Sequence, residues 1–191
     1  YNVAPTSQVP ILRVNQGQRE PVAARWGLIP PWAKDEKISY STINAKAETV
    51  HEKPAFRAAF KRKRCVVLAD GYYEWTGPKG DKQPHYIRMA DDRPLVFLGL
   101  WENWRDNISC TIITTEANPQ LEHLHSRMPC ITAVDSDSID LWLDPEFEDS
   151  SYLRSLLKPV GDGVLQSTKV SRYVNKVGNQ GPECIEPLAA E

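Results

Sequence analysis

Three apolar segments in the middle of the chain are joined by connections so short that they limit how the segments can pair. Residues 84–90, 95–101 and 108–115 are rich in β-branched and aromatic side chains, and short turns of Asp with Pro or Asn separate them. Strands that pair in parallel need a crossover of a dozen residues or more, which these connections do not provide. The pattern therefore predicts consecutive antiparallel strands over this part of the chain.

Further strands and a few helices are predicted on both sides of this region. The expected strands cover residues 9–14, 22–26, 65–69 and 130–134, with one more within the turn-rich tail 170–184. One expected helix starts at about Lys53, and two more lie near 136–143 and near 151–157. Tightly connected strands with few helices predict an α+β fold. We expect a single domain over residues 1–191, with a curved, mainly antiparallel, barrel-like sheet.

The composition fits one ordinary globular core, but the charges are segregated. Of the 191 residues, 41% are hydrophobic and the formal net charge is −2, so nothing in the whole chain calls for nucleic acid or membrane. Six basic residues and no acid lie between Lys53 and Arg64, whereas seven acids and no base lie between Asp135 and Asp149. A basic face of this kind can hold phosphates, although a solvated helix face is the commoner explanation of one charge run.

The four cysteines, Cys65, Cys110, Cys130 and Cys184, are widely spaced and form no C-x-x-C pair. This spacing predicts neither a zinc site nor a disulfide framework, so we expect no metal, no cofactor and reduced thiols in a cytoplasmic protein. The chain shows no signal peptide and no apolar run of about 18 residues, so no membrane partner is expected. Because it starts at Tyr1 without a methionine, we expect encoded residues upstream.

Glu74 is the first candidate for a chemical role. It follows the apolar strand 65–69 and lies between Tyr73 and Trp75, where loss of water can raise the pKa of a carboxyl group. A carboxyl with a raised pKa suits a general acid or base. A strand carboxylate that faces water is an equally good reading of this segment alone.

The remaining candidates each have a plain structural explanation as well. Trp26 and Trp32 flank a proline-rich loop and suit either stacking on bases or packing in the core. His123 and His125 point to opposite faces of an extended segment, which disfavours a metal site made by the pair. Asn44 on its own reads as a turn or cap residue.

Five segments in order carry a resemblance to a known family. They match the patterns Y-N-x-A-P at residues 1–5, W-G-x-x-P-x-W at 26–32, I-N-A-R-x-E at 43–48, A-D-G-[FY]-x-E-W at 69–75 and H-x-R-M-P at 125–129. The segments V-S-x-x-V-N at 170–175 and N-Q-G at 179–181 fit as well. Taken together, the chain resembles the SOS response-associated peptidase (SRAP) family over nearly its whole length.

The resemblance implies a sensor of abasic sites in single-stranded DNA that acts in the DNA damage response. Members crosslink to the lesion through an N-terminal cysteine, whose α-amine forms a Schiff base with the sugar aldehyde and whose thiol closes a thiazolidine ring. That Cys-Gly-Arg opening is absent here, and Lys46 stands where the family has arginine. An internal cysteine has no free amine beside its sulfur, so the chain as given cannot form this crosslink.

The resemblance also implies a role for each matching residue. Asn44 would fix the N-terminal residue, Glu74 would shuttle a proton, and His125 would polarise or protonate the sugar oxygen. The implied DNA-binding residues are Asn2, Trp26, Trp32, Lys46, Arg57, Lys61 and Arg127.

Two alternatives to covalent capture stay open. One is a cysteine-type peptidase, with self-processing of the initiator methionine as its expected activity, and the family resemblance adds a possible lyase reaction at the abasic site. The other is a non-covalent module that binds single-stranded DNA. The expected partner is single-stranded DNA with abasic sites, and the expected setting is a monomer in the bacterial cytoplasm, associated with the nucleoid.

Overall fold

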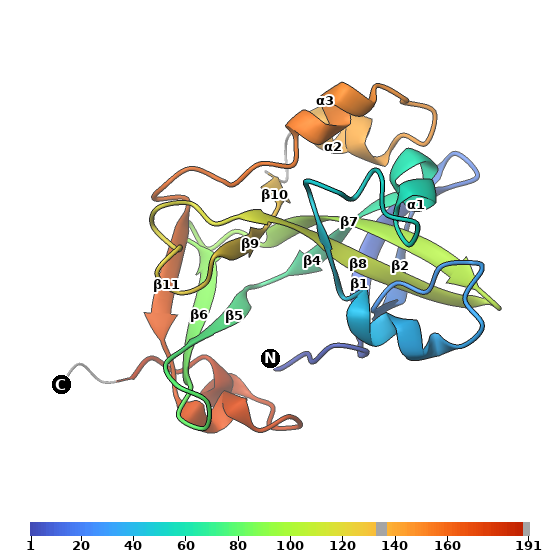
Figure 1. The fold of residues 1–191 in the computed structure, drawn as a ribbon. Coiled ribbons are helices and arrows are strands. Elements are labelled where there is room, and N and C mark those ends of the chain that lie inside the picture. Colours follow the sequence, from blue (N-terminus) through green and yellow to red (C-terminus); the bar gives the residue numbers. More distant parts are fainter. Residues whose placement is uncertain (133–136, 189–191) are drawn as a thin grey trace.

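Eleven strands and a few short helices make up the residues that the computed structural model describes, 1–132 and 137–188 (Figure 1). The strands are β1 Gln8–Asn15, β2 Gln18–Trp26, β3 Asn44–Lys46, β4 Arg64–Ala69, β5 Tyr72–Thr76, β6 Gln83–Met89, β7 Leu95–Trp104, β8 Asn107–Glu116, β9 Arg127–Pro129, β10 Ile131–Thr132 and β11 Leu165–Lys169. The α-helices are α1 Arg57–Arg62, α2 Asp137–Leu143 and α3 Ser150–Ser155, and the 3-10 helices are η1 Glu36–Ser41, η2 Arg172–Asn175 and η3 Pro182–Cys184. The expected α+β class is confirmed.

Five strands of the larger sheet close into a ring. Strand β7 pairs with both β4 and β8, and the order β7, β4, β1, β2, β8 returns to β7. Most of these pairs are antiparallel, whereas β2 and β3 run parallel to β8. The β1–β2 hairpin turns through Gln16 and Gly17, both in the left-handed region that a type I′ turn requires. The curved, mainly antiparallel sheet is therefore as predicted, and in place of the expected barrel it forms a ring-like sheet with β3, β9 and β10 outside the ring.

A smaller sheet of three strands, in the order β11, β6, β5, stands beside the ring (Figure 1). The prediction that the strand over 84–90 pairs with the strand over 95–101 is wrong, because β6 pairs with β5 and β11 instead. The connection between β6 and β7 passes through Asp92 in the left-handed region and carries the chain from one sheet to the other. A short connection permits a hairpin but does not require one. The expected β7–β8 hairpin is present.

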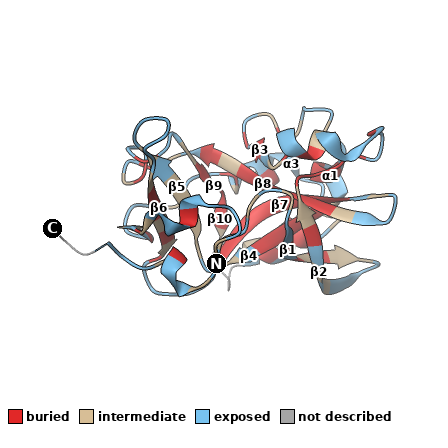
Figure 2. Ribbon diagram, turned by 90° about the horizontal axis from the view of Figure 1, so that it is seen from below, coloured by how far each residue is buried: buried red, intermediate tan, exposed pale blue. Residues whose placement is uncertain are grey.

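One apolar cluster packs on each face of the large sheet, so the central strands are largely buried (Figure 2). Val66 of β4 lies in the cluster under the α-helices, whereas its neighbours Cys65 and Val67 lie in the other cluster. The indole N–H of Trp142, a fully buried side chain of α2, donates to the Cys65 carbonyl oxygen at 2.8 Å. This bond fixes the helical layer on the sheet.

The helices differ from expectation mainly at their ends. The first begins at Arg57 instead of Lys53, because residues 49–56 form turns. Helix α2 matches the prediction from Asp137 on, and its expected first residue, 136, lies outside the described residues, as do 133 and 134 of the expected strand 130–134. Within the described part of the chain, no helix has the length and apolar character that crossing a membrane requires.

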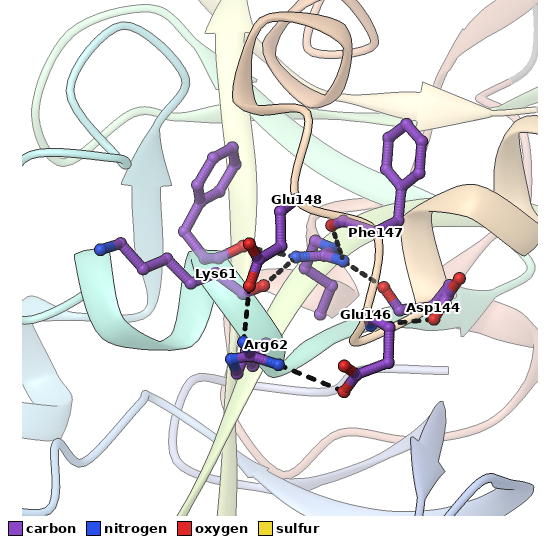
Figure 3. A network of polar contacts seen from close by, with 8 residues as sticks. Lys61, Arg62, Asp144, Glu146, Phe147 and Glu148 are labelled. Atoms are coloured by element: carbon purple, nitrogen blue, oxygen red, sulfur yellow. Dashed lines mark hydrogen bonds and ion pairs between the residues drawn. The ribbon is translucent and has the colours of Figure 1, made fainter.

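The basic and acidic runs meet in one network (Figure 3). Arg62 forms ion pairs with Glu146 at 3.2 Å and Glu148 at 2.5 Å. The buried guanidinium of Arg64 donates to main-chain carbonyls around it, and its burial lowers its pKa to about 10. The carbonyls belong to Phe60, Lys61, Trp142, Asp144 and Phe147. Part of the basic run is therefore structural.

Candidate functional site

Glu74 stands where the chain passes from the large sheet to the small one. Strand β4 leads through Asp70 and Gly71 into β5, and a Cβ on Gly71 would lie 2.3 Å from the Tyr86 ring, so only glycine fits this bend. The side chain of Glu74 is 23% exposed. Burial raises the pKa of the Glu74 carboxyl group, and the charge of His125 opposes this rise only in part.

His125 is the closest described partner of this carboxylate in the candidate site. Its Nδ1 lies 4.0 Å from Oε1 of Glu74, a distance for an ion pair but too long for a direct hydrogen bond. The same Nδ1 lies 3.1 Å from both the backbone nitrogen and the carbonyl oxygen of Arg127. The backbone of Arg127 therefore holds the imidazole ring in place, through its N–H or its carbonyl oxygen according to the tautomer.

Arg127 extends from β9 across β8 to Glu48, two residues beyond the end of β3. Its two terminal nitrogens donate to the Glu48 carboxylate at 3.2 Å and 2.9 Å, and its Nε donates to the Thr114 hydroxyl at 3.2 Å. Burial on its own would raise the pKa of Glu48, but the hydrogen bond and charge of Arg127, a backbone hydrogen bond and the charge of Lys46 lower it overall. Glu48 thus fixes the direction of the Arg127 side chain.

Asn44 and Lys46 lie on the exposed face of β3. They alternate with the buried Ala45, and Glu48 continues the same alternation beyond the strand. Strand β8 joins the two halves of the site, because residues 112–114 pair with β3 and residues 114–116 pair with β9. The structure thus brings Glu74, His125 and Arg127 into one chain of contacts and places β3 beside it.

The predicted stacking tryptophans differ in exposure. The indole N–H of Trp26 donates to the Ile43 carbonyl oxygen at 2.8 Å, and its ring packs on the apolar cluster, so Trp26 connects the loop to the start of β3. Trp32 is 59% exposed. Arg57 and Lys61 are exposed on α1, and the Lys61 amino group points away from the Arg64 network in Figure 3. A role of these residues in DNA binding stays a prediction.

Asn2 ties the first residues of the chain to its C-terminal tail. Its side-chain amide donates to the carbonyls of Val174 at 3.0 Å and Lys176 at 3.3 Å. The Gln180 amide clamps the Asn2 backbone, accepting from its N–H at 3.2 Å and donating to its carbonyl at 2.8 Å. Asn2 therefore has an anchoring role here, and its predicted contact with DNA stays untested.

The two neighbours of Glu74 hold this anchor from the other face of β5. The Tyr73 hydroxyl donates to the carbonyl oxygen of Tyr1 at 3.1 Å, and the Trp75 indole N–H donates to Asn175 at 2.8 Å. Because side chains alternate along a strand, Tyr73 and Trp75 face the first residues and the C-terminal tail, while Glu74 faces the five-stranded ring of the large sheet. The first residues of the chain are thus fixed beside the strand that carries Glu74.

The four cysteines are free and buried. Burial raises the pKa of Cys110 and of Cys130 to about 12, and it raises the pKa of Cys65 well above its usual range. A nucleophilic cysteine reacts as its thiolate, and these three stay protonated near neutral pH. Among the described residues, no group of three or more His, Cys, Asp or Glu side chains could hold a metal ion.

Two residues of the site were missed in the sequence. Glu48 could have been found from the alternation of Asn44, Lys46 and Glu48, which puts all three on one face. His85 could not, because its place opposite Glu74 depends on the β5–β6 register.

The model of the SOS response associated peptidase (SRAP) family matches residues 1–177. The chain belongs to the SRAP family. It is 43% identical to the abasic site processing protein YoqW of Bacillus subtilis, over 97% of this chain and 85% of YoqW. It is 32% identical to the abasic site processing protein HMCES of Xenopus tropicalis, over 98% of this chain and 66% of HMCES.

Solved structures share the SRAP-like fold seen here. A protein from Bacteroides thetaiotaomicron superposes with a TM-score of 0.84 at 29% identity, over 96% of this chain and 82% of that one. A protein from Bordetella bronchiseptica superposes with a TM-score of 0.73 at 27% identity, over 88% of this chain and 86% of that one. Family membership and fold thus agree, and the chemistry has to be argued from the site.

Proposed function

We propose that the protein recognises abasic sites in single-stranded DNA and captures them covalently through a cysteine at the mature N-terminus, upstream of Tyr1. The observation that carries the proposal is the pairing of the half-buried Glu74 with His125 at 4.0 Å, on a strand whose neighbouring side chains hold the first residues of the chain. The names of the relatives support the lesion, since YoqW and HMCES are both called abasic site processing proteins.

The chemistry begins with opening of the sugar. An abasic deoxyribose is a cyclic hemiacetal, and protonation of its ring oxygen with loss of the hydroxyl proton gives the free aldehyde. We assign the protonation to His125, because an imidazole can carry a proton near neutral pH. The cysteine amine then adds to the aldehyde carbon, and the resulting carbinolamine loses water to form an iminium ion.

Ring closure completes the capture. The thiolate adds to the iminium carbon, so the net reaction of aldehyde, amine and thiol is a thiazolidine plus one water. Glu74, whose pKa is raised, would donate the proton that leaves with this water and accept one from the amine. Asn44 would hold the cysteine by hydrogen bonds, while Arg127 and Lys46 would bind the flanking phosphates.

The test uses the full-length protein with its N-terminal cysteine and single-stranded DNA that carries one abasic site. We expect an adduct that survives SDS and is absent for the variant with serine in place of that cysteine. Glu74→Gln should slow formation or reversal of the adduct, whereas Glu36→Gln, on the exposed helix η1, should not. Failure of the unaltered protein to form any adduct would falsify the proposal.

The family name supports a second activity, removal of the protein's own initiator methionine. This step would expose the α-amine that the capture requires, so it fits the same site and needs no general peptide cleft. An intermediate Schiff base also gives a route to strand cleavage by elimination, a lyase reaction. We propose both as side activities of a monomeric, cytoplasmic protein. Turnover of an unrelated protein substrate would contradict the restriction to self-processing.

A further inference from the structure

A cavity of about 570 Å³ is lined by His85, the strand partner of Glu74, and by His123, two residues before His125, and its polar lining is basic or neutral. The chemistry-bearing side chains of the lining are His85, His123, Lys169, Gln120, Gln166 and Ser167. No carboxylate is among the described residues that line it. Two imidazoles and an ammonium group, with amides and a hydroxyl, form a donor set that suits an anion.

The register of the small sheet explains how these groups meet. His85 of β6 is paired with Glu74 of β5 on one side and with Lys169 of β11 on the other. Directly paired residues project from the same face of a sheet, so the three side chains form a row. Two strand spacings separate the ends of the row, about 10 Å between the backbones of Glu74 and Lys169. His123 reaches the same place from the segment that carries His125.

The basic side chains of the row, His85 and Lys169, lie close together. His85 is 7% exposed, and its Nε2 lies 3.0 Å from the Thr76 hydroxyl. Burial lowers the pKa of His85, and the charges of Lys169 and His123 lower it further. An anion in the cavity would be attracted by the Lys169 ammonium group and would accept hydrogen bonds from the imidazole N–H groups. Because Lys169 and His123 are exposed, the cavity opens to solvent.

We propose that this cavity binds a phosphodiester group of the DNA strand whose abasic site lies at Glu74 and His125. This inference rests on the proposed function for the identity of the strand. The row extends from the Glu74 carboxylate to Lys169. A DNA strand whose abasic site lies at Glu74 therefore places a neighbouring phosphate near Lys169. Arg127 and Lys46 lie toward β3, and the two sets would therefore contact the strand on opposite sides of the lesion.

The test measures how the full-length protein binds an intact single-stranded oligonucleotide, by fluorescence anisotropy at several salt concentrations. We expect Lys169→Gln and His123→Gln each to weaken binding about five-fold, uniformly across sequences. Loss of one phosphate contact by Lys169→Gln should reduce the slope of log affinity against log salt by about 0.7. Lys158→Gln, which removes an exposed charge after α3, is the matched control and should change neither quantity. Equal behaviour of Lys169→Gln and Lys158→Gln would overturn the proposal.

A second measurement separates a strand phosphate from a free anion. Titration with inorganic phosphate, followed by the ring resonances of His85 and His123, should show only weak binding, and the intact oligonucleotide should shift the same resonances at far lower concentration. If inorganic phosphate binds the cavity but Lys169→Gln leaves DNA affinity unchanged, the assignment to DNA is wrong. Intact DNA forms no adduct, so its binding to the cavity does not depend on the crosslinking reaction. The phosphate site can therefore be confirmed when the crosslinking test fails, and it can be excluded when the crosslinking test succeeds.

Discussion

Glu48 holds the guanidinium group of Arg127 through two hydrogen bonds, of 3.2 Å and 2.9 Å, across strand β8. The Thr114 hydroxyl takes a third, from Nε. The Arg127 side chain is thus already oriented before any ligand binds, so binding would cost little side-chain conformational entropy. The carboxylate also reduces the local positive charge, so a DNA phosphate bound by Arg127, as proposed, would share the guanidinium with Glu48.

Loss of this pair should show first in stability. We expect Glu48→Gln to lower the free energy of unfolding at pH 7 by about 0.5–1 kcal/mol, because the pair is partly exposed. The folded state lowers the pKa of Glu48, so its stabilisation is present above the ordinary value of 4.5 and is lost as the pH falls through the folded value. Urea unfolding from pH 7 to pH 3 measures this, with Glu122→Gln as the exposed control. A difference that persists at pH 3 would contradict the assignment.

Binding and chemistry should separate at two residues. We expect Arg127→Ala to weaken binding of intact single-stranded DNA about ten-fold, since it removes a charged contact with phosphate. Arg127→Lys should restore little, because one ammonium cannot reproduce the fork that meets Glu48 and a phosphate. Asn44→Ala should leave this affinity nearly unchanged and slow the crosslink. If Asn44→Ala abolished binding of intact DNA, the role given to Asn44 would be wrong.

Glu74 should destabilise the fold at neutral pH. Its raised pKa means that the folded protein binds more protons than the unfolded one between pH 4.5 and the raised value, so stability falls as the pH rises through that range. Glu74→Gln removes this dependence. The melting temperature of the variant should therefore rise relative to that of the unaltered protein as the pH increases from 4.5. The variant should also crosslink more slowly. A constant difference in melting temperature across this range would show that the Glu74 pKa is not raised.

The anchor of the first residues should matter to capture but not to binding. We expect Gln180→Ala, which removes both clamps on the Asn2 backbone, to increase hydrogen exchange at the Asn2 amide and to slow crosslinking several-fold. Affinity for intact DNA should stay the same. Gln18→Ala, at an exposed position of β2, serves as control. Unchanged exchange at Asn2 would mean that the clamp is absent in solution.

Local pattern predicted the elements of this fold well and their partners less well. The run 65–69 became β4 and the hairpin over 95–115 became β7 and β8, since apolar runs and short turns decide such features within a few residues. The pairing of β6 was mispredicted, because a five-residue connection allows two outcomes and packing of both sheets chooses between them. The parallel pairing of β3 with β8 depends on contacts far apart in the sequence.

The site shows the same division. Ordered motifs identified Glu74, His125 and Arg127, which the structure connects by contacts. They could not identify the row through His85, because it arises from strand register alone.

The contact of Asn2 with Val174, Lys176 and Gln180 also fixes an order of events in biosynthesis. Residues up to Gln180 must leave the ribosome before Tyr1 and Asn2 find their partners. Until then the growing polypeptide contains the strand with Glu74 but lacks the residues that fix Tyr1 and Asn2. Under the proposed function, capture of an aldehyde would therefore become possible only after residues 174–180 have been made, which would keep unfinished chains from joining to DNA.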